Sequence, residues 1–257
     1  MDSKNLFVIT GHSSGLGKAL AEHYLAAGAG VIGISRRKWP SEQANTQELH
    51  EYIVDLADAQ AVSSLLGNPD FQTRCKTAAR LVLINNAGTL APSRLAGRSG
   101  WQETAQAVAL NIAAPLMLAD AFITWQQECA ASGISDGLQT LDIVHISSGA
   151  GRKAYPAWSV YGACKAALDQ HARVIAAEAH PKVRIVSLAP GVVDTQMQQQ
   201  IRAGNADDFP LLETFRKLHS EGQLASAQQT AEKIAAFIVS PDFGSETVFD
   251  IRNFAAE

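Results

Sequence analysis

Short apolar segments rich in Val, Ile and Leu recur along the whole chain, and segments with helical periodicity separate them. Their hydrophobicity is nearly continuous, as expected of strands that helices cover on both faces. The intervening lengths suit right-handed crossovers between parallel strands. The sequence therefore predicts an α/β fold with a doubly wound parallel sheet of seven strands. The candidate strands are residues 6–9, 31–34, 52–54, 81–84, 141–146, 183–186 and 247–251.

The whole chain, residues 1–257, is expected to form a single domain. Its length exceeds that of a typical domain, but α/β folds of this size often share one core. No repeat, low-complexity tract or linker divides it. The least regular stretch, residues 195–224, follows the sixth candidate strand. Because ligands bind beyond the carboxyl ends of parallel strands, we expect a lid there; a surface insertion is the alternative.

Composition excludes several classes of function. The 21 basic and 25 acidic residues give a net charge of -4, and no run of Lys or Arg predicts nucleic-acid binding. The three cysteines are odd in number and far apart, without ligands at metal-binding intervals, which predicts reduced thiols in a cytoplasmic protein and no metal site. A polar N-terminus and the absence of an apolar run near ~18 residues predict neither an export signal nor a membrane anchor.

A glycine-rich loop follows the first candidate strand and precedes a helical segment at residues 18–27. Its glycines permit a tight turn and let backbone N–H groups approach a pyrophosphate, which faces the positive end of the helix dipole. A plain glycine turn is the alternative. The placement predicts a Rossmann-type dinucleotide site. The candidate contacts are Gly11, Ser13, Ser14, Gly15, Leu16 and Gly17.

The second candidate strand ends at Ser35, Arg36 and Arg37, where an acidic residue would bind the ribose hydroxyls of NAD. Two guanidinium groups at this position suit the 2'-phosphate of NADP, because they offer fixed and permanently charged donors. A solvated strand end is the alternative. We therefore expect NADP(H) to be preferred over NAD(H).

Tyr161 and Lys165 lie four residues apart in a helical segment, so they share one face. A phenol has an ordinary pKa of about 10, and a nearby cation is expected to lower it toward the pH at which proton transfer is efficient. Such a pair also occurs on ordinary helices. Ser147 and Ser148, however, lie at the end of the fifth candidate strand, where a hydroxyl can donate to a substrate oxygen. Together these residues predict carbonyl chemistry.

Six motifs in order, across residues 6–251, resemble the short-chain dehydrogenase/reductase (SDR) family. The loop at residues 10–17 has the spacing Thr-Gly-x-x-x-Gly-x-Gly, and residues 85–88 read Asn-Asn-Ala-Gly. A serine stands thirteen residues before Tyr-x-x-x-Lys, and residues 190–195 read Pro-Gly-Val-Val-Asp-Thr. The loop has His12 where many NADP-dependent relatives carry a basic residue.

The resemblance implies further cofactor contacts. Asp55 would bind the adenine amino group, although an N-cap role for it is nearly as well supported. Thr195 and the backbone near it would hold the nicotinamide carboxamide. The remaining implied contacts are Leu56, Asn86, Ala87, Gly88, Tyr161, Lys165, Pro190, Gly191 and Val193.

The resemblance also implies the catalytic set Asn111, Ser148, Tyr161 and Lys165. The thirteen-residue interval of the family selects Ser148 over Ser147. Asn111 would bend its helix and hold a water that passes protons to Lys165; an amide in solvent is the alternative. Relatives are commonly homodimers or homotetramers.

The second half of the chain contains residues 147–150 with Trp158 and Tyr161, residues 194–197 and 215–219, and a terminal strand that ends at residues 250–252. These segments are similar to the branch that contains benzil reductases and sepiapterin reductase. This implies an NADPH-dependent carbonyl reductase acting on a small-molecule ketone or vicinal dicarbonyl. Tyr155, Trp158, Met197 and Phe215 are expected to form an aromatic and thioether pocket wall, or else plain core. Asp250 lies near the position of the Asp with which sepiapterin reductases hold a pterin. Two alignments, which differ by one residue, are open for it. The alternatives are an NAD-dependent alcohol dehydrogenase and a non-catalytic NADPH sensor or scaffold.

Overall fold

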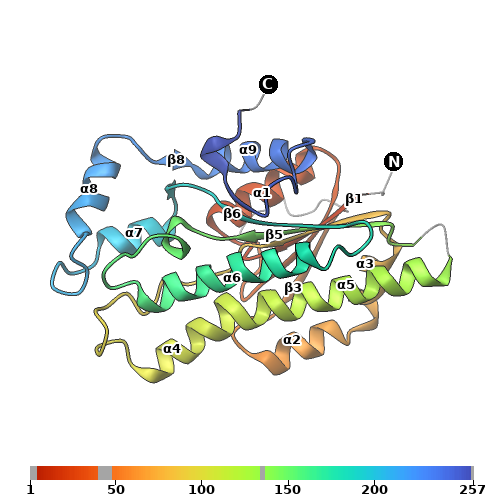
Figure 1. Ribbon diagram of the computed structural model, residues 1–257, viewed down its shortest axis with the longest axis horizontal. Helices are drawn as coiled ribbons and strands as arrows, with labels where there is room; N and C mark the ends of the chain where they lie inside the picture. Colours follow the sequence, from red (N-terminus) through yellow and green to blue (C-terminus); the bar gives the residue numbers. More distant parts are fainter. Residues whose placement is uncertain (1–4, 40–47, 134–136, 256–257) are drawn as a thin grey trace.

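The computed structural model describes residues 5–39, 48–133 and 137–255, and a seven-stranded parallel sheet lies at the centre of this part of the chain (Figure 1). The strand order β3-β2-β1-β4-β5-β6-β9 confirms the predicted doubly wound α/β fold. The strands are β1 (Asn5–Thr10), β2 (Gly30–Ser35), β3 (Leu49–Ile53), β4 (Arg80–Asn85), β5 (Thr140–Ile146), β6 (Val183–Ala189) and β9 (Val248–Asp250).

Helices cover both faces of the sheet, as Figure 1 shows. On one face α1 (Gly15–Ala26) packs against α9 (Ala227–Val239), and the first apolar core lies between them and the strands. The second core lies on the opposite face and includes Phe71, Leu118 and Phe122. The helices of that face are α2 (Ala59–Leu66), α3 (Pro69–Thr77), α5 (Ala114–Ser132) and α6 (Ser159–Ala177).

The strand order reverses at β1, which pairs with β2 on one side and with β4 on the other. The chain leaves β1 toward α1 and leaves β4 toward α4 (Trp101–Val108) and α5, on opposite faces of the sheet. Such a switch point opens a crevice at the carboxyl ends of the strands. The fold therefore places the loops after β1 and β4 beside one another.

Strand β3 begins three residues earlier than the sequence predicted. Its residues, Leu-His-Glu-Tyr-Ile, are partly exposed because β3 is the edge strand of the sheet. An edge strand needs less apolar surface than a central one, so only its final residues satisfied the criterion of an apolar run.

The stretch at residues 195–224 contains two helices, α7 (Gln196–Arg202) and α8 (Leu212–Ser220), and Figure 1 shows it extending beyond one end of the sheet. A short parallel pair joins β7 (Val193–Asp194) to β8 (Ala225–Ser226). This pair, which the sequence did not predict, holds the two ends of the excursion together.

Among the described residues one helical stretch, Trp101–Ser132, is long enough to cross a membrane and contains a window of mean hydropathy 1.7. The expectation that no apolar run approaches that length is wrong for this stretch. Leu118 and Phe122 of α5, however, are fully buried in the second core. Because one face of the helix packs on the sheet, core packing accounts for its apolar composition.

Candidate active site

A cavity of about 500 Å³ opens at the carboxyl ends of the strands and is lined by the loops that follow β1 to β6. Ser148, Tyr161 and Lys165 line it, as do all the predicted cofactor contacts except Gly17. Asn111 lies behind the wall and does not line the cavity. Within the described ranges, no group of three or more His, Cys, Asp or Glu side chains is arranged to hold a metal ion.

The glycine loop has the backbone that a phosphate site requires. Gly11 and Gly15 have φ values of +72° and +55°, which side chains other than glycine rarely adopt. Ser14 precedes α1 without capping it through its side chain, and the first turn of α1 contains no acidic residue. The N–H groups at the start of α1 therefore suit an anion such as a pyrophosphate.

Gly17 has a packing role in this loop. A Cβ at position 17 would lie 2.4 Å from the Gly11 carbonyl oxygen and 2.5 Å from Nδ2 of Asn86. Glycine is therefore required where α1 packs against the turn, which explains why Gly17 does not line the cavity.

Thr10 connects the loops after β1 and β4. Its hydroxyl oxygen accepts hydrogen bonds from the backbone N–H groups of Asn86 and Ala87, each at 2.9 Å. The Asn86 side chain donates in return to the Thr10 carbonyl at 2.9 Å. These bonds hold Asn86, Ala87 and Gly88 at the cavity wall.

The end of the cavity that follows β2 and β3 is solvent-exposed. Arg36 and Arg37 are exposed and line it, and the Ser35 hydroxyl donates to the Arg37 carbonyl. Asp55 is also exposed at the wall. The N-cap of α2 is Asp58, whose carboxylate accepts from the N–H groups of residues 60 and 61, so the N-cap alternative for Asp55 is wrong.

His12 does not reach this end of the cavity. Its ring is fully buried against Gly33, where a Cβ would lie 2.3 Å from the imidazole, and Nε2 contacts the Glu51 carboxylate at 2.8 Å. The same carboxylate oxygen accepts from the backbone N–H of Trp39 at 2.7 Å. Glu51, which sequence reasoning missed, thus connects the glycine loop to the segment just beyond Arg37.

The reacting end of the cavity is buried. Tyr161 and Lys165 are 8% and 5% exposed, and the Lys165 ammonium lies 5.5 Å from the centroid of the Tyr161 ring. Lys165 Nζ donates to the Ile146 carbonyl at 2.7 Å. Ser148 Oγ accepts from the Ala150 N–H at 3.1 Å, so its own proton remains available to Tyr161 or to a substrate oxygen.

Burial dominates the ionisation of both groups. It raises the pKa of Tyr161 to about 12, an effect that a hydrogen bond from Ser148 partly opposes. It lowers the pKa of Lys165 to about 8, opposed by Cys164 and Asp169. The expectation of a lowered pKa for Tyr161 is therefore wrong in direction, because burial is the largest cause of the shift. At neutral pH the phenol is protonated, as a proton donor must be.

Asn111 stabilises the loop after β4 from within a π-helical turn, Ala109–Ala113. Its side chain accepts from the Thr89 N–H and donates to the Thr89 carbonyl, both at 2.8 Å. The residue is buried, so the alternative of an amide in solvent is wrong. A Cβ on Gly88 would lie 3.0 Å from Asn111 Oδ1 and 3.7 Å from Lys165 Nζ, which shows how closely this loop approaches the reacting groups.

Another part of the cavity has an aromatic wall. Tyr155, Trp158, Met197 and Phe215 all line it, and they also belong to, or pack against, a third apolar cluster. Trp158 stacks on Phe209 with ring centroids 5.1 Å apart and planes at 8°. The four residues are thus both wall and core. Residues that sequence reasoning missed here are Leu90, Gln196, Gln198 and Gln200. The three glutamines lie within five residues after Thr195, and that position was the available signal.

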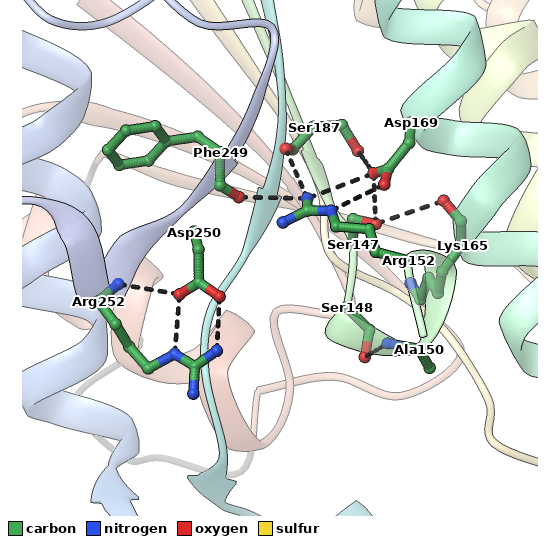
Figure 2. A network of polar contacts seen from close by, with 10 residues as sticks. All are labelled: Ser147, Ser148, Ala150, Arg152, Lys165, Asp169, Ser187, Phe249, Asp250 and Arg252. Atoms are coloured by element: carbon green, nitrogen blue, oxygen red, sulfur yellow. Dashed lines mark hydrogen bonds and ion pairs between the residues drawn. The ribbon is translucent and has the colours of Figure 1, made fainter. Parts of the chain in front are cut away.

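Two charged residues lie where β9 ends at the cavity. Arg252 donates to both carboxylate oxygens of Asp250, at 2.9 and 2.6 Å (Figure 2). These hydrogen bonds lower the pKa of Asp250. Asp250 is therefore a cavity residue whose carboxylate already has a charged partner.

The turn after β6 carries the predicted nicotinamide contacts and lies beside Arg252, since a Cβ on Gly191 would lie 3.5 Å from Arg252 Cδ. Pro190, Gly191, Val193 and Thr195 all line the cavity. Thr195 is the residue before α7, and its side chain makes no capping hydrogen bond. A Cβ on Gly15 would lie 3.4 Å from the Thr195 methyl, so the glycine loop and this turn face each other closely.

The fold and the cavity define an α/β protein of the Rossmann-like class with a site suited to an extended anionic ligand. The chain belongs to the short chain dehydrogenase family, whose sequence model matches residues 5–206. It is 32% identical over 255 residues to a benzil reductase ((S)-benzoin forming) of Bacillus subtilis, covering 97% of this chain and 99% of the relative.

Two further similarities support the same family. Rat (Rattus norvegicus) sepiapterin reductase is 33% identical over 251 residues, which cover 93% of this chain and 92% of that protein. A short-chain dehydrogenase/reductase structure from Burkholderia vietnamiensis superposes with a TM-score of 0.68 at 34% identity and covers 99% of this chain and all of that one. The chain is thus an SDR oxidoreductase that is similar to the benzil and sepiapterin reductases.

Proposed function

We propose that this protein is an NADPH-dependent carbonyl reductase that reduces a ketone or one carbonyl of a vicinal dicarbonyl, with Tyr161 as the proton donor. The observation that carries the proposal is the buried, protonated phenol of Tyr161 beside the Ser148 hydroxyl and Lys165, inside the cavity. The similarity to benzil and sepiapterin reductases supports the substrate class.

The cavity residues fit a dinucleotide along its length. The left-handed glycines and the uncapped start of α1 suit its pyrophosphate. Arg36 and Arg37 suit a 2'-phosphate, and no acidic side chain follows β2 directly to bind free ribose hydroxyls. Asp55 lies within reach of the adenine end of the same wall. These features favour NADPH over NADH.

When bound, the cofactor supplies a hydride to the carbonyl carbon. Ser148 donates a hydrogen bond to the carbonyl oxygen, where negative charge develops. Tyr161 transfers its proton to that oxygen, which leaves an alcohol and a tyrosinate. Lys165 stabilises the tyrosinate as it forms and would hold the ribose of the bound cofactor. Asn111 keeps Gly88 and Thr89 in place beside Lys165, and its water relay, which would reprotonate Tyr161, stays a prediction.

The aromatic wall supports a flat, apolar substrate. Tyr155, Trp158 and Phe215 present ring surfaces at the end of the cavity opposite the exposed arginines. Met197 adds a polarisable side chain from α7. We propose that α7 and α8 act as the lid over this end, since Met197 and Phe215 belong to them.

We also propose that the protein works in the cytoplasm as a homodimer or homotetramer. Trp101 and Val108 of α4 and Val174 of α6 are exposed apolar side chains on the helices through which association is expected. Light scattering on the purified protein tests this, and a monomer at micromolar concentration contradicts it.

A substrate panel tests the function. Benzil, sepiapterin and an ortho-quinone are each incubated with the enzyme and NADPH, and cofactor absorbance is followed, with NADH as the control. We expect rapid consumption of NADPH with benzil and slow consumption of NADH. Alcohol oxidation with NAD⁺ as the main reaction would instead identify an alcohol dehydrogenase. Tight NADPH binding without turnover of any substrate would identify a sensor.

A further inference from the structure

A buried carboxylate lies directly behind the reacting groups. Asp169 of α6 has a side chain that is 2% exposed, and it lines no part of the cavity. It accepts from Ser147 Oγ at 2.7 Å, Ser187 Oγ at 2.6 Å and Arg152 Nε at 2.9 Å (Figure 2). A buried carboxylate needs such partners. Of the three, Ser147 lines the cavity, whereas Arg152 and Ser187 lie behind it.

Two of these partners flank the turn that carries Ser148. Ser147 precedes it at the end of β5, and Arg152 follows the 3-10 turn Gly149–Gly151. Both ends of the turn therefore bind one carboxylate. The turn also packs tightly on α6, because a Cβ on Gly151 would lie 2.8 Å from the backbone of Lys165.

The carboxylate belongs to the helix that carries the other reacting groups. Asp169 lies four residues after Lys165 and eight after Tyr161, on the same face of α6. Arg152 extends the connection, since its Nη2 donates to the carbonyls of Ser187 on β6 and Phe249 on β9. The network thus links the Ser148 turn, α6 and the neighbouring strands β6 and β9.

We propose that Asp169 and Arg152 form a positioning pair that sets the Ser148 hydroxyl against the Tyr161 phenol. Neither residue lines the cavity, so both act through the turn and the helix that they join. The proposal rests on the proposed function, since it concerns the same reaction. It gives Ser147, the rival candidate in the sequence, an anchoring role.

The chain offers a matched control at the opposite end of the sheet. Asp142 of β5 also has a side chain that is 2% exposed, and it forms ion pairs with Arg80 and Arg184 at 2.6 and 2.7 Å. It lies near the amino end of β5, far from the cavity residues at the carboxyl end. Loss of either carboxylate removes a buried ion pair, but only Asp169 is connected to the Ser148 turn.

The test compares Asp169→Asn with Asp142→Asn in the full-length enzyme. Both substitutions should lower Tm. Only Asp169→Asn should lower kcat, by about 10²-fold, because a small misplacement of a reacting group has that effect. The KM for NADPH should change by less than about twofold, as expected when only transition-state interactions are lost. Equal kcat values for the two variants would overturn the proposal.

Substitutions of Arg152 separate position from charge and remain informative if Asp169→Asn does not fold. Asp169→Asn removes a negative charge near Lys165, whereas Arg152→Met removes a positive one. If kcat falls in both variants, the position of the Ser148 turn is therefore the cause, and not the charge near Lys165. Arg152→Lys keeps the charge without the guanidinium fork, so we expect it to recover part of the kcat lost in Arg152→Met. Full activity of Arg152→Met would contradict the proposal.

Crystal structures of the variants make the result independent of turnover. In Asp169→Asn the turn from Ser148 to Arg152 should shift or lose order, while in Asp142→Asn it should not move. An unmoved turn in Asp169→Asn contradicts the positioning role. If the wild-type enzyme turns over no carbonyl or alcohol, the proposed function fails, and these structures still decide the positioning of Ser148.

Discussion

The two ends of the cavity are built differently. At the reacting end Tyr161 and Lys165 are buried and hydrogen-bonded or packed within the protein, whereas at the adenosine end Arg36, Arg37 and Asp55 are exposed to solvent. Charges act strongly where water is excluded and are screened where it is not. Substitutions at the buried end should therefore change kcat, and those at the exposed end should change cofactor binding in a salt-dependent way.

Tyr161→Phe should have the largest effect and separates the two ends most sharply. Removal of the proton donor should lower kcat by at least about 10³-fold. The Kd for NADPH, measured by fluorescence titration, should stay within about twofold, because the pyrophosphate and 2'-phosphate contacts lie elsewhere. Substantial carbonyl reduction by this variant would show that another group donates the proton.

The pH profile of the reduction reports on the same end. Lys165 is an ammonium below its pKa of about 8, and Tyr161 is protonated below its pKa of about 12. Turnover needs both protons, so kcat should be level at neutral pH and fall about tenfold per unit as the pH rises well above 8. Initial rates across a series of buffers at constant ionic strength measure this. A kcat that rises between pH 8 and 10 would contradict the assignment of Tyr161 as an acid.

Arg36→Ser tests the exposed end. It should raise the KM for NADPH about tenfold and leave the KM for NADH and both kcat values nearly unchanged, since one charge-assisted contact is lost. The effect should shrink at high salt. Arg37→Ser serves as the neighbouring control with a smaller effect. An equal rise in KM for both cofactors would show that Arg36 does not recognise the 2'-phosphate.

Glu51→Gln should have the smallest effect, on the geometry of the exposed end. Glu51 connects His12 to Trp39 just beyond the two arginines, so its loss should reduce the preference for NADPH over NADH by about threefold. Glu48→Gln, at the residue that precedes β3, is the control and should leave the preference for NADPH over NADH unchanged. An unchanged preference in Glu51→Gln would mean that the arginines are positioned without this carboxylate.

The sequence predicted the parts of the molecule that local pattern determines. The central strands, the glycine loop and the positions of Ser148, Tyr161 and Lys165 at the cavity follow from apolar runs and from motif spacing. The direction of the pKa change of Tyr161 did not follow, because burial depends on elements far along the chain.

The sequence also did not predict the directions in which side chains point. His12 turns into the protein to meet Glu51, and Asn111 binds the backbone of Thr89, although both residues lie in recognisable motifs. The β7–β8 pair consists of two residues on each strand, too few to leave an apolar pattern. Such contacts arise from tertiary packing alone.

The central claim is that the protein catalyses hydride transfer from NADPH to a carbonyl carbon in this cavity. It is tested most directly with NADPH that carries deuterium at both C4 positions, benzil as substrate, and mass and NMR spectra of the product. We predict benzoin with one deuterium on its carbinol carbon. Benzoin with hydrogen at that carbon, or no benzoin, would contradict the account.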